Sequence, residues 1–504
     1  MSGLLLEAAR LPGSAEVVDV LIDRGRVAAI RPHGAAADGS AVSAGVGAHG
    51  VDPSAERIRL DGRWLIPGLH DRHVHMSQWA MVSGRLDLAG AASAAEAARA
   101  VGRAVAGGAG EVAGFGYRDG LWPDAPSLAL LDEVSGDVPV VLVAADLHAC
   151  WLNSAAARRH RVGPGEDGVL RESDAFALVR ELDDVADHVL DGWVSAAATR
   201  AAARGVVGIA DYEMRWNRDD WARRAADGGF PLRVAFGIYP QHLDRALDDG
   251  LRTGGAVAGT DGLVVVGGAK IITDGSLNTR TAWCFDPYPG LEGHPHAAGV
   301  ATVPYDELVP LMRRAHSGGL APAVHAIGDR ANARALDAFE AVGCRGTIEH
   351  AQLLRHEDVP RLARLGLIAS VQPEHAMDDR DVADRYWVGR TDRAFMLADL
   401  AAAGVELALG SDAPVAPLDP WVAIAAAVGR TREGRDPWHP EQAIDVRTAL
   451  AASTNGAGAR VQLGGPADLA VVERDPFTAT PEALRSMPVA ATFLGGRPTF
   501  STLG

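Results

Sequence analysis

The sequence predicts an α/β fold: a (β/α)8 TIM barrel with a small composite β-sandwich domain built from both termini and an insertion after the first barrel strand. Three observations support this fold class. Short apolar runs that end in polar residues recur through the middle of the chain, helical patterns lie between several of them, and both chain ends have the texture of β-hairpins. The length of 504 residues suits one large barrel with additions, or two or three small domains.

Composition narrows the class of partners. Hydrophobic residues make up 48% of the chain and charged residues 22%, as in folded soluble proteins. The formal net charge of -17 would repel nucleic acid and anionic membranes at long range. We therefore expect a small-molecule substrate, no nucleic acid and no membrane partner, with a homodimer as the default assembly.

The cysteines and the first residues predict a cytoplasmic protein. The three cysteines, Cys150, Cys284 and Cys344, are too few and too scattered for a disulfide framework. The first seven residues have no basic segment, and their apolar run stops at Glu7, unlike a signal peptide.

The two chain ends predict the composite β domain. Alternating runs at residues 17–22 and 26–30 precede an Ala/Gly-rich patch at 34–50. Similar runs at 467–472 and 489–494 lie near the C-terminus. We assign residues 1–63 and 462–504 to the β-sandwich domain, and residues 64–461 to the barrel.

The first barrel strand, residues 65–75, carries a candidate metal-binding pair. It ends in two histidines, His73 and His75, separated by one residue. Side chains alternate along a strand, so both point the same way and form a pair of potential ligands. Taken alone, such a pair also occurs by chance on surface loops.

Seven further strands follow and complete the number that closes a (β/α) barrel. The apolar runs are 206–211, 232–239, 263–274, 321–329, 347–352, 367–372 and 407–412, and helices are expected at 305–316, 332–342 and 358–365. The C-terminal strand ends line the active site in such barrels. An insertion at about 76–204, with its own strands at 112–117 and 138–145, is expected to roof the pocket.

The later strand ends supply further candidate ligands, namely Lys270, His325, His350 and Asp412. Together with the first pair they form a nitrogen- and oxygen-rich set that suits zinc or a similar divalent ion.

Several ordered motifs carry a resemblance to a known family. They are Pro67-Gly68 before the histidine pair, Asp274-Gly275-Ser276-Leu277 with Arg280-Thr281-Ala282, His325-Ala326-Ile327-Gly328-Asp329, Glu349-His350-Ala351-Gln352 and Ser411-Asp412-Ala413-Pro414-Val415. The order of ligands resembles the amidohydrolase superfamily. The motifs resemble amidohydrolase family 3, which includes YtcJ-like proteins and N-substituted formamide deformylases, over nearly the whole chain.

The resemblance implies roles for the six candidate ligands. His73, His75 and Asp412 would bind a first metal. His325 and His350 would bind a second, or His350 would contact substrate in a one-metal site. Lys270 would be N6-carboxylated, because a carbamate offers anionic oxygens that an ammonium lacks. The alternative keeps Lys270 as an ammonium paired with Asp274.

The resemblance also implies a reaction. A water activated by the metal, with Asp412 as its general base, would hydrolyse an amide such as an N-acyl or N-formyl bond. His350 would also lie at the catalytic centre. Alternatives are a deaminase or a cyclic-ester or carbamate hydrolase of the same superfamily, and a non-catalytic scaffold. The chain contains no G-X-X-X-X-G-K-[ST], G-X-S-X-G or H-E-X-X-H motif, which disfavours phosphotransferases and serine hydrolases.

Candidate substrate-binding residues are fewer and less distinctive. His148, in Asp146-Leu147-His148, is followed by Trp151, and Trp122 is one of several aromatic residues that could line an apolar pocket. Arg280 could hold an anionic substrate group or pair with Asp274. A second histidine pair, His294 and His296, lies in a Pro- and Gly-rich stretch that indicates a surface loop.

Overall fold

The chain forms two compact units in a computed structural model that describes residues 3–34, 55–117, 119, 122–144, 149–226 and 228–503. One unit comprises Met1–Met76 and Ala198–Gly504, and the other Ser77–Ala197. Most of the Ala/Gly-rich patch, from residue 35 on, lies outside the described residues.

The larger unit contains the predicted eight-stranded parallel barrel. Its strands are β6 (Leu69–Val74), β12 (Val206–Asp211), β13 (Arg233–Ile238), β14 (Val264–Ile272), β15 (Pro322–Ala326), β16 (Thr347–His350), β17 (Ile368–Val371) and β18 (Glu406–Leu409). They pair in this order, each with the next. A parallel bridge between Val74 and Ala413 brings the two ends of the sheet together. The barrel fold class is therefore confirmed.

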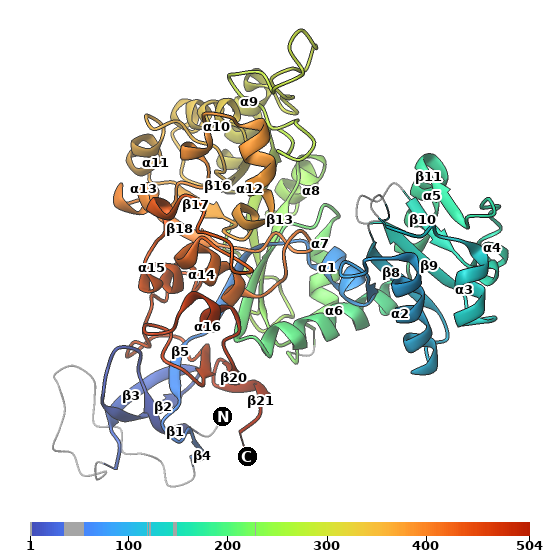
Figure 1. The fold of residues 1–504 in the computed structure, drawn as a ribbon. Helices are drawn as coiled ribbons and strands as arrows, with labels where there is room; N and C mark the ends of the chain where they lie inside the picture. Colours follow the sequence, from blue (N-terminus) through green and yellow to red (C-terminus); the bar gives the residue numbers. More distant parts are fainter. Residues whose placement is uncertain are drawn as a thin grey trace. The chain divides into compact units, whose positions relative to one another are not determined.

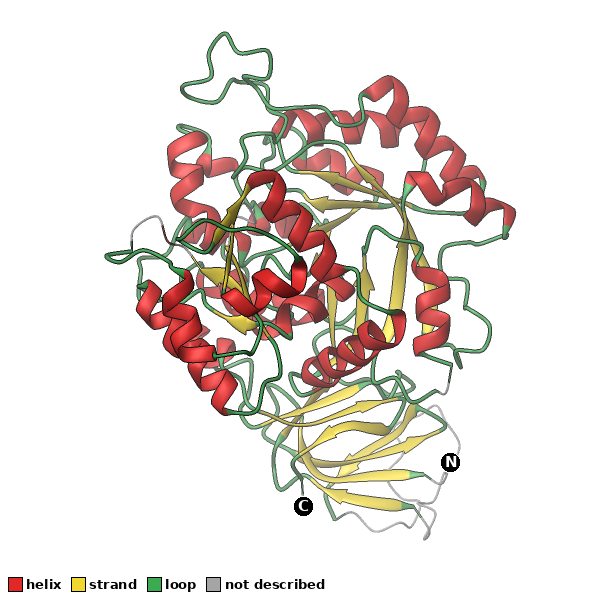
Figure 2. Cartoon of the chain, turned by 90° about the vertical axis from the view of Figure 1, so that its right-hand side faces the viewer, coloured by secondary structure: helices red, strands yellow, loops and turns green. Residues whose placement is uncertain are grey.

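Helices cover the outside of this sheet, as the red helices around the yellow strands in Figure 2 show. They are α7 (Asn217–Arg224), α8 (Leu243–Asp248), α9 (Tyr305–Ser317), α10 (Asp329–Val342), α11 (Val359–Leu365), α12 (His375–Tyr386), α13 (Leu397–Ala402), α14 (Pro420–Gly429), α15 (Val446–Ala452) and α16 (Pro481–Arg485). Helix α10 packs five apolar residues, among them Leu336 and Phe339, into the barrel core.

Both chain ends build one mixed sheet, as predicted. It contains β1 (Leu4–Arg10), β2 (Val17–Asp23), β3 (Arg26–Pro32), β4 (Glu56–Arg59), β5 (Trp64–Pro67), β19 (Leu469–Val472), β20 (Val489–Leu494) and β21 (Arg497–Ser501). In Figure 1 the blue N-terminal strands lie beside red strands β20 and β21. Leu6, Leu65 and Phe493 are fully buried in the core of this sheet.

The predicted single strand at 65–75 is in fact two strands that belong to different sheets. Strand β5 pairs with β19 in the terminal sheet, and β6 pairs with β12 in the barrel. Gly68 lies between them, where an added Cβ would come within 2.4 Å of Val207 Cγ1. A glycine at this close approach lets the chain pass from one sheet to the other.

The smaller unit has its own sheet and core. Its strands pair in the order β11 (Val169–Arg171), β10 (Ala149–Leu152), β9 (Val140–Ala144), β8 (Val112–Tyr117) and β7 (Leu86–Asp87). Residues 76–202 also form α1 (Met76–Ser83), α2 (Ala94–Ala106), α3 (Leu128–Ser135), α4 (Ser154–His160), α5 (Glu172–Asp183) and α6 (Asp187–Ala202). The two strands predicted at 112–117 and 138–145 are present as β8 and β9. The role of this insertion as a roof over the pocket stays a prediction.

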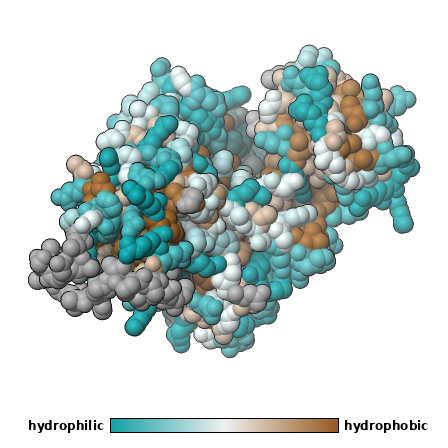
Figure 3. Space-filling view, turned by 90° about the horizontal axis from the view of Figure 1, so that it is seen from below, coloured by the Kyte–Doolittle hydropathy of each residue, from teal (hydrophilic) through white to brown (hydrophobic). Residues whose placement is uncertain are grey.

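The surface is mostly polar on the face shown in Figure 3, where teal hydrophilic residues surround smaller brown hydrophobic patches. Within the described ranges, no helix combines the length and the apolar character needed to cross a membrane.

Candidate metal centre

The C-terminal ends of the barrel strands carry the predicted ligands. His73 lies near the end of β6 and His75 directly follows it, while His325 and His350 lie at or near the ends of β15 and β16. Lys270 lies near the end of β14, and Asp412 follows β18. Because the strands are parallel, these ends share one mouth of the barrel.

Asp412 is the point on which the histidines converge. Its Oδ1 lies 3.4 Å from Nε2 of His75 and 3.6 Å from Nε2 of His73, and its Oδ2 lies 4.0 Å from Nε2 of His375. Two groups of potential metal ligands therefore share this carboxylate: His73, His75 and Asp412, and His350, His375 and Asp412. Burial alone would raise the pKa of Asp412, but the facing imidazoles, first that of His73, hold it well below its ordinary value.

A buried carboxylate orients His73. Oε2 of Glu349 lies 2.7 Å from Nδ1 of His73, an arrangement in which Nδ1–H donates to the carboxylate. The Nε2 lone pair of His73 then faces Asp412. Burial, with the charge of Lys270, lowers the pKa of His73 to about 4, so the ring is neutral at pH 7 and able to ligate.

Lys270 lies next to His73 and not next to Asp274. Its Nζ is 3.3 Å from Nε2 of His73 and 4.5 Å from the ring centre of Tyr212. Burial lowers the pKa of Lys270 to about 8. Asp274 instead accepts hydrogen bonds from the backbone N–H groups of Trp283, Ile327 and Gly328, and its Oδ1 lies 3.4 Å from Nε2 of His325. The structure thus contains no contact for the alternative pairing of Lys270 with Asp274 among the described residues.

The remaining histidine rings pack closely. The ring centres of His325 and His350 are 4.5 Å apart, and those of His350 and His73 are 4.9 Å apart. His350 and Asp412 also adopt left-handed backbone conformations, with φ of 75° and 57°. Non-glycine residues in this region carry strain that tends to occur at functional sites.

His375 is a site residue that the sequence analysis did not identify. It is the first residue of α12, four residues after the end of β17, and its ring stacks on that of His350 at 6.3 Å with an interplanar angle of 16°. The available signal was a histidine in Gln372-Pro373-Glu374-His375, just past the predicted strand at 367–372. Glu349 lay within a recognised motif, but its contact with His73 was not predicted either.

The donor set fits a divalent ion. Within the described part of the chain, four buried imidazole nitrogens of this set make no hydrogen bond: Nδ1 of His75, Nε2 of His325, Nδ1 of His350 and Nε2 of His375. Most buried polar atoms in proteins are hydrogen-bonded, so a cluster of unpaired ones indicates a ligand-binding function. Imidazole nitrogen and carboxylate oxygen are the ligands that zinc and similar ions take.

The predicted substrate-binding residues in the insertion have other surroundings. Trp151 is fully buried in the core of the smaller unit, and its indole N–H donates to the backbone carbonyl of Ser127. The ring centre of Trp122 lies 6.4 Å from that of Trp151, and the indole N–H of Trp122 donates to the backbone carbonyl of Ala91. His148 lies outside the described residues. A role for these residues in substrate binding stays a prediction.

Arg280 does not form the expected pair with Asp274 in the described structure. Its guanidinium instead lies 5.4 Å from the ring centre of Tyr386. The second histidine pair, His294 and His296, is exposed in a loop, with ring centres 5.8 Å apart.

Comparisons with known proteins agree with the geometry of fold and site. The sequence matches the model of the amidohydrolase family over residues 56–500. It is 28% identical to the putative amidohydrolase YtcJ of Bacillus subtilis over 489 residues, which cover 88% of this chain and 90% of that protein. It is 26% identical to N-substituted formamide deformylase of Arthrobacter pascens over 496 residues, or 88% and 90% of the two chains.

A solved structure shares the fold. An uncharacterized metal-dependent hydrolase from Pyrococcus horikoshii superimposes with a TM-score of 0.76 at 24% sequence identity, covering 95% of this chain and 99% of that one. The match to the family model includes every barrel strand, together with β4, β5, β19, β20 and most of β21 from the terminal sheet. From this match the chain belongs to the amidohydrolase family.

Proposed function

We propose that this protein is a metal-dependent hydrolase that cleaves an amide-type C–N bond, such as an N-acyl or N-formyl bond, of a small organic molecule. The observation that carries the proposal is the convergence of two histidine groups on the single carboxylate of Asp412. The similarity to a protein named N-substituted formamide deformylase supports the choice of bond.

The metal would be held by His73, His75 and Asp412, with His350, His375 and His325 beside them. We propose zinc as the ion, because the donors are mainly imidazole nitrogens. When bound, such an ion supplies Lewis acidity and lowers the pKa of water towards neutrality.

The residues of the chain provide the proton transfers. Asp412 is a low-pKa carboxylate that faces the site and accepts the proton of the attacking water. The same carboxylate then delivers the proton to the leaving nitrogen, so that the amine departs neutral. Glu349 keeps His73 in the tautomer whose Nε2 faces the site.

Lys270 is proposed to be carboxylated. Its amine lies at the buried centre of the site, next to His73, and carboxylation would exchange a buried cation for anionic oxygens that can ligate. Incorporation of isotopically labelled bicarbonate, followed by NMR, should show a carbamate signal in the wild type and none in Lys270→Ala.

The function is tested with Asp412→Asn and a panel of N-substituted formamides and N-acyl amines. With saturating zinc, so that the histidines and the amide oxygen still hold the metal, we expect turnover to fall by at least about a hundredfold because the general base is lost, while metal content stays mostly unchanged. Asp392→Asn removes a carboxylate that is 60% exposed and should behave like the wild type. Full activity of Asp412→Asn would contradict the assigned role.

The products distinguish the proposed reaction from others of the superfamily. Release of formate or another carboxylate together with an amine supports amide hydrolysis. Release of ammonia from an amino-substituted ring would instead identify a deaminase.

A further inference from the structure

A cavity lies at the end of the barrel opposite to the metal centre. It has a volume of about 460 Å³ and is lined by residues from the N-terminal ends of the barrel strands. On β16, Thr347 lines this cavity, whereas His350 at the other end of the strand belongs to the metal centre. On β14, Val265 likewise lines the cavity, whereas Lys270 belongs to the metal centre.

The cavity exists because small side chains line part of the barrel interior. Barrel interiors are usually filled by branched side chains, but Ala210, Ala235 and Ala323 lie here, beside Val265 and Ile368. An apolar cavity of about 150 Å³ is enough to bind benzene. The volume found here also falls within the range of roughly 300–1,000 Å³ that is typical of small-molecule pockets.

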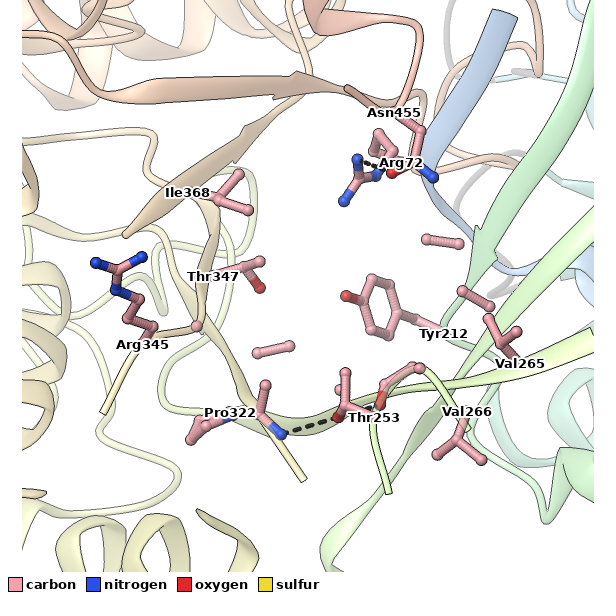
Figure 4. A pocket seen from close by; sticks show the side chains of 18 of the residues that line it. Arg72, Tyr212, Thr253, Val265, Val266, Pro322, Arg345, Thr347, Ile368 and Asn455 are labelled. Carbon is pink, nitrogen blue, oxygen red and sulfur yellow. Dashed lines mark hydrogen bonds between the residues drawn. The ribbon is translucent and has the colours of Figure 1, made fainter. Parts of the chain in front are cut away.

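The charged part of the lining has an excess of cationic residues. The lining includes two arginines, Arg72 and Arg345, and a single acidic residue, Glu406, in a chain whose formal charge is -17. Nη1 of Arg72 donates to Oδ1 of Asn455 at 2.5 Å, as Figure 4 shows. Among the described residues, no carboxylate lies within 4.0 Å of either guanidinium, although arginine forms strong paired hydrogen bonds with carboxylates.

The cavity can be reached from the surface. A neighbouring hollow of about 530 Å³ shares Arg72, Glu406 and Asn455 with it. Glu406 and Asn455 are exposed, and Arg72 is partly exposed. A small molecule can therefore enter beside the guanidinium of Arg72.

The inner wall contacts a residue that orients a metal ligand. The hydroxyl groups of Tyr212 and Thr347 face each other across the cavity in Figure 4, and both contact Oε1 of Glu349. The other oxygen of Glu349 binds His73. A ligand in the cavity would thus be separated from Glu349, the partner of His73, only by Tyr212 and Thr347.

We propose that this cavity is a second binding site, distinct from the metal centre, for a small organic carboxylate. The carboxylate pairs with Arg72, and an apolar part about the size of a benzene ring lies among the alanines. The chemistry follows from the lining: at the entrance lies the guanidinium of Arg72, which has no carboxylate partner among the described residues, and behind it lies an apolar interior.

The position of the ligand is tested by crystallography with 4-bromobenzoate and metal-loaded protein. We expect a bromine anomalous peak among Ala210, Ala235 and Ile368, with the carboxylate at Arg72. A peak only at the metal centre, or none, would overturn the proposal.

The affinity is tested by calorimetric titration of 4-bromobenzoate into metal-loaded wild type and variants. Arg72→Gln removes the charge and Ala235→Leu fills the space, and we expect each to weaken binding at the cavity by at least about tenfold. Arg24→Gln, whose side chain is 92% exposed, is the matched control and should bind like the wild type. The neutral 4-bromobenzyl alcohol should bind at least about tenfold more weakly.

If one variant fails to fold, as judged by near-UV circular dichroism, the other variant and the neutral probe still test whether the carboxylate binds in the cavity. Equal affinity of wild type, Ala235→Leu and Arg72→Gln for 4-bromobenzoate would show that the cavity is not the binding site.

Discussion

At the scale of single residues, His375 adds a potential metal ligand to the centre from a helix and not from a strand. Its Nε2 is buried without a hydrogen-bond partner in the described structure and lies 4.0 Å from Oδ2 of Asp412. Together with His350 it forms the second group of potential ligands. This position favours a metal-binding role over a packing role, because a packing histidine usually satisfies both ring nitrogens.

We predict that His375→Ala lowers the metal affinity of the protein by at least about tenfold, because one donor of the second group is lost. Metal content after dialysis against buffered zinc, measured by mass spectrometry, checks this. The control is His316→Ala, which removes an exposed histidine at the end of α9. Equal metal content in His375→Ala and wild type would mean that His375 does not ligate.

The sequence was sufficient to predict that His73, His75 and Asp412 lie together, because their positions follow from strand alternation or from an ordered motif. His375 was missed because it belongs to the first turn of a helix, and the path of a loop after a strand is not encoded in hydrophobic periodicity. The contact between Glu349 and His73 was missed for a related reason: it joins two strands that are 276 positions apart in sequence.

Asp19 stabilises a backbone irregularity in β1. The pairing of β1 with β2 shifts register between Leu6 and Ala9, and Ala8 has a φ of 55°. Oδ1 of Asp19 accepts a hydrogen bond from the Ala8 N–H at 2.9 Å and lies 2.7 Å from Nδ1 of His33. Burial alone would raise the pKa of Asp19, but these hydrogen bonds hold it below its ordinary value.

We predict that Asp19→Asn lowers the free energy of unfolding by about 1–2 kcal/mol at pH 7. The folded-state pKa lies below the unfolded value of 3.8, so the carboxylate stabilises the fold above that pH and loses its effect as pH falls through the folded-state pKa. Urea denaturation of both proteins should therefore show a difference that narrows below pH 4. A difference that stays constant with pH would mean that the charge of Asp19 is not involved.

At the scale of elements, Gly68 separates a strand of the terminal sheet from the first strand of the barrel. Hydrophobic patterning showed one continuous apolar run across residues 65–69, so the sequence predicted a single strand. The division arises from long-range pairing, of β5 with β19 and of β6 with β12, which no local pattern reports.

We predict that Gly68→Ala destabilises the protein by about 1–3 kcal/mol, because its Cβ would overlap the side chain of Val207. The backbone movement that relieves this overlap would also disturb β6, so zinc affinity should fall together with the unfolding midpoint. Gly229→Ala is the matched control, since nothing lies within 4 Å of an added Cβ there. Equal effects of the two substitutions would argue against a close-packing requirement at Gly68.

At the scale of the whole molecule, the terminal sheet joins segments from both ends of the sequence to the barrel. Leu469 of β19 pairs with Pro67 of β5 on one side and with Phe493 of β20 on the other. The sequence predicted this arrangement because both ends showed strand patterns around an α/β middle. Which strands would be neighbours could not be predicted, since each pairing depends on the fold of the residues between them.

Phe493 lies at the centre of this connection and provides a test of whether the terminal sheet stabilises the larger unit. Its side chain is fully buried in the sheet core with Leu6 and Leu65, so Phe493→Ala should cost about 3–5 kcal/mol of unfolding free energy through lost contacts and a cavity. Phe500→Ala, on the partly exposed strand β21, should cost clearly less. Because β5 runs directly into β6, we expect urea to release metal and unfold the terminal sheet at one shared, lowered midpoint in Phe493→Ala. Retention of metal at urea concentrations that have already unfolded the terminal sheet would show instead that the barrel is stable without it.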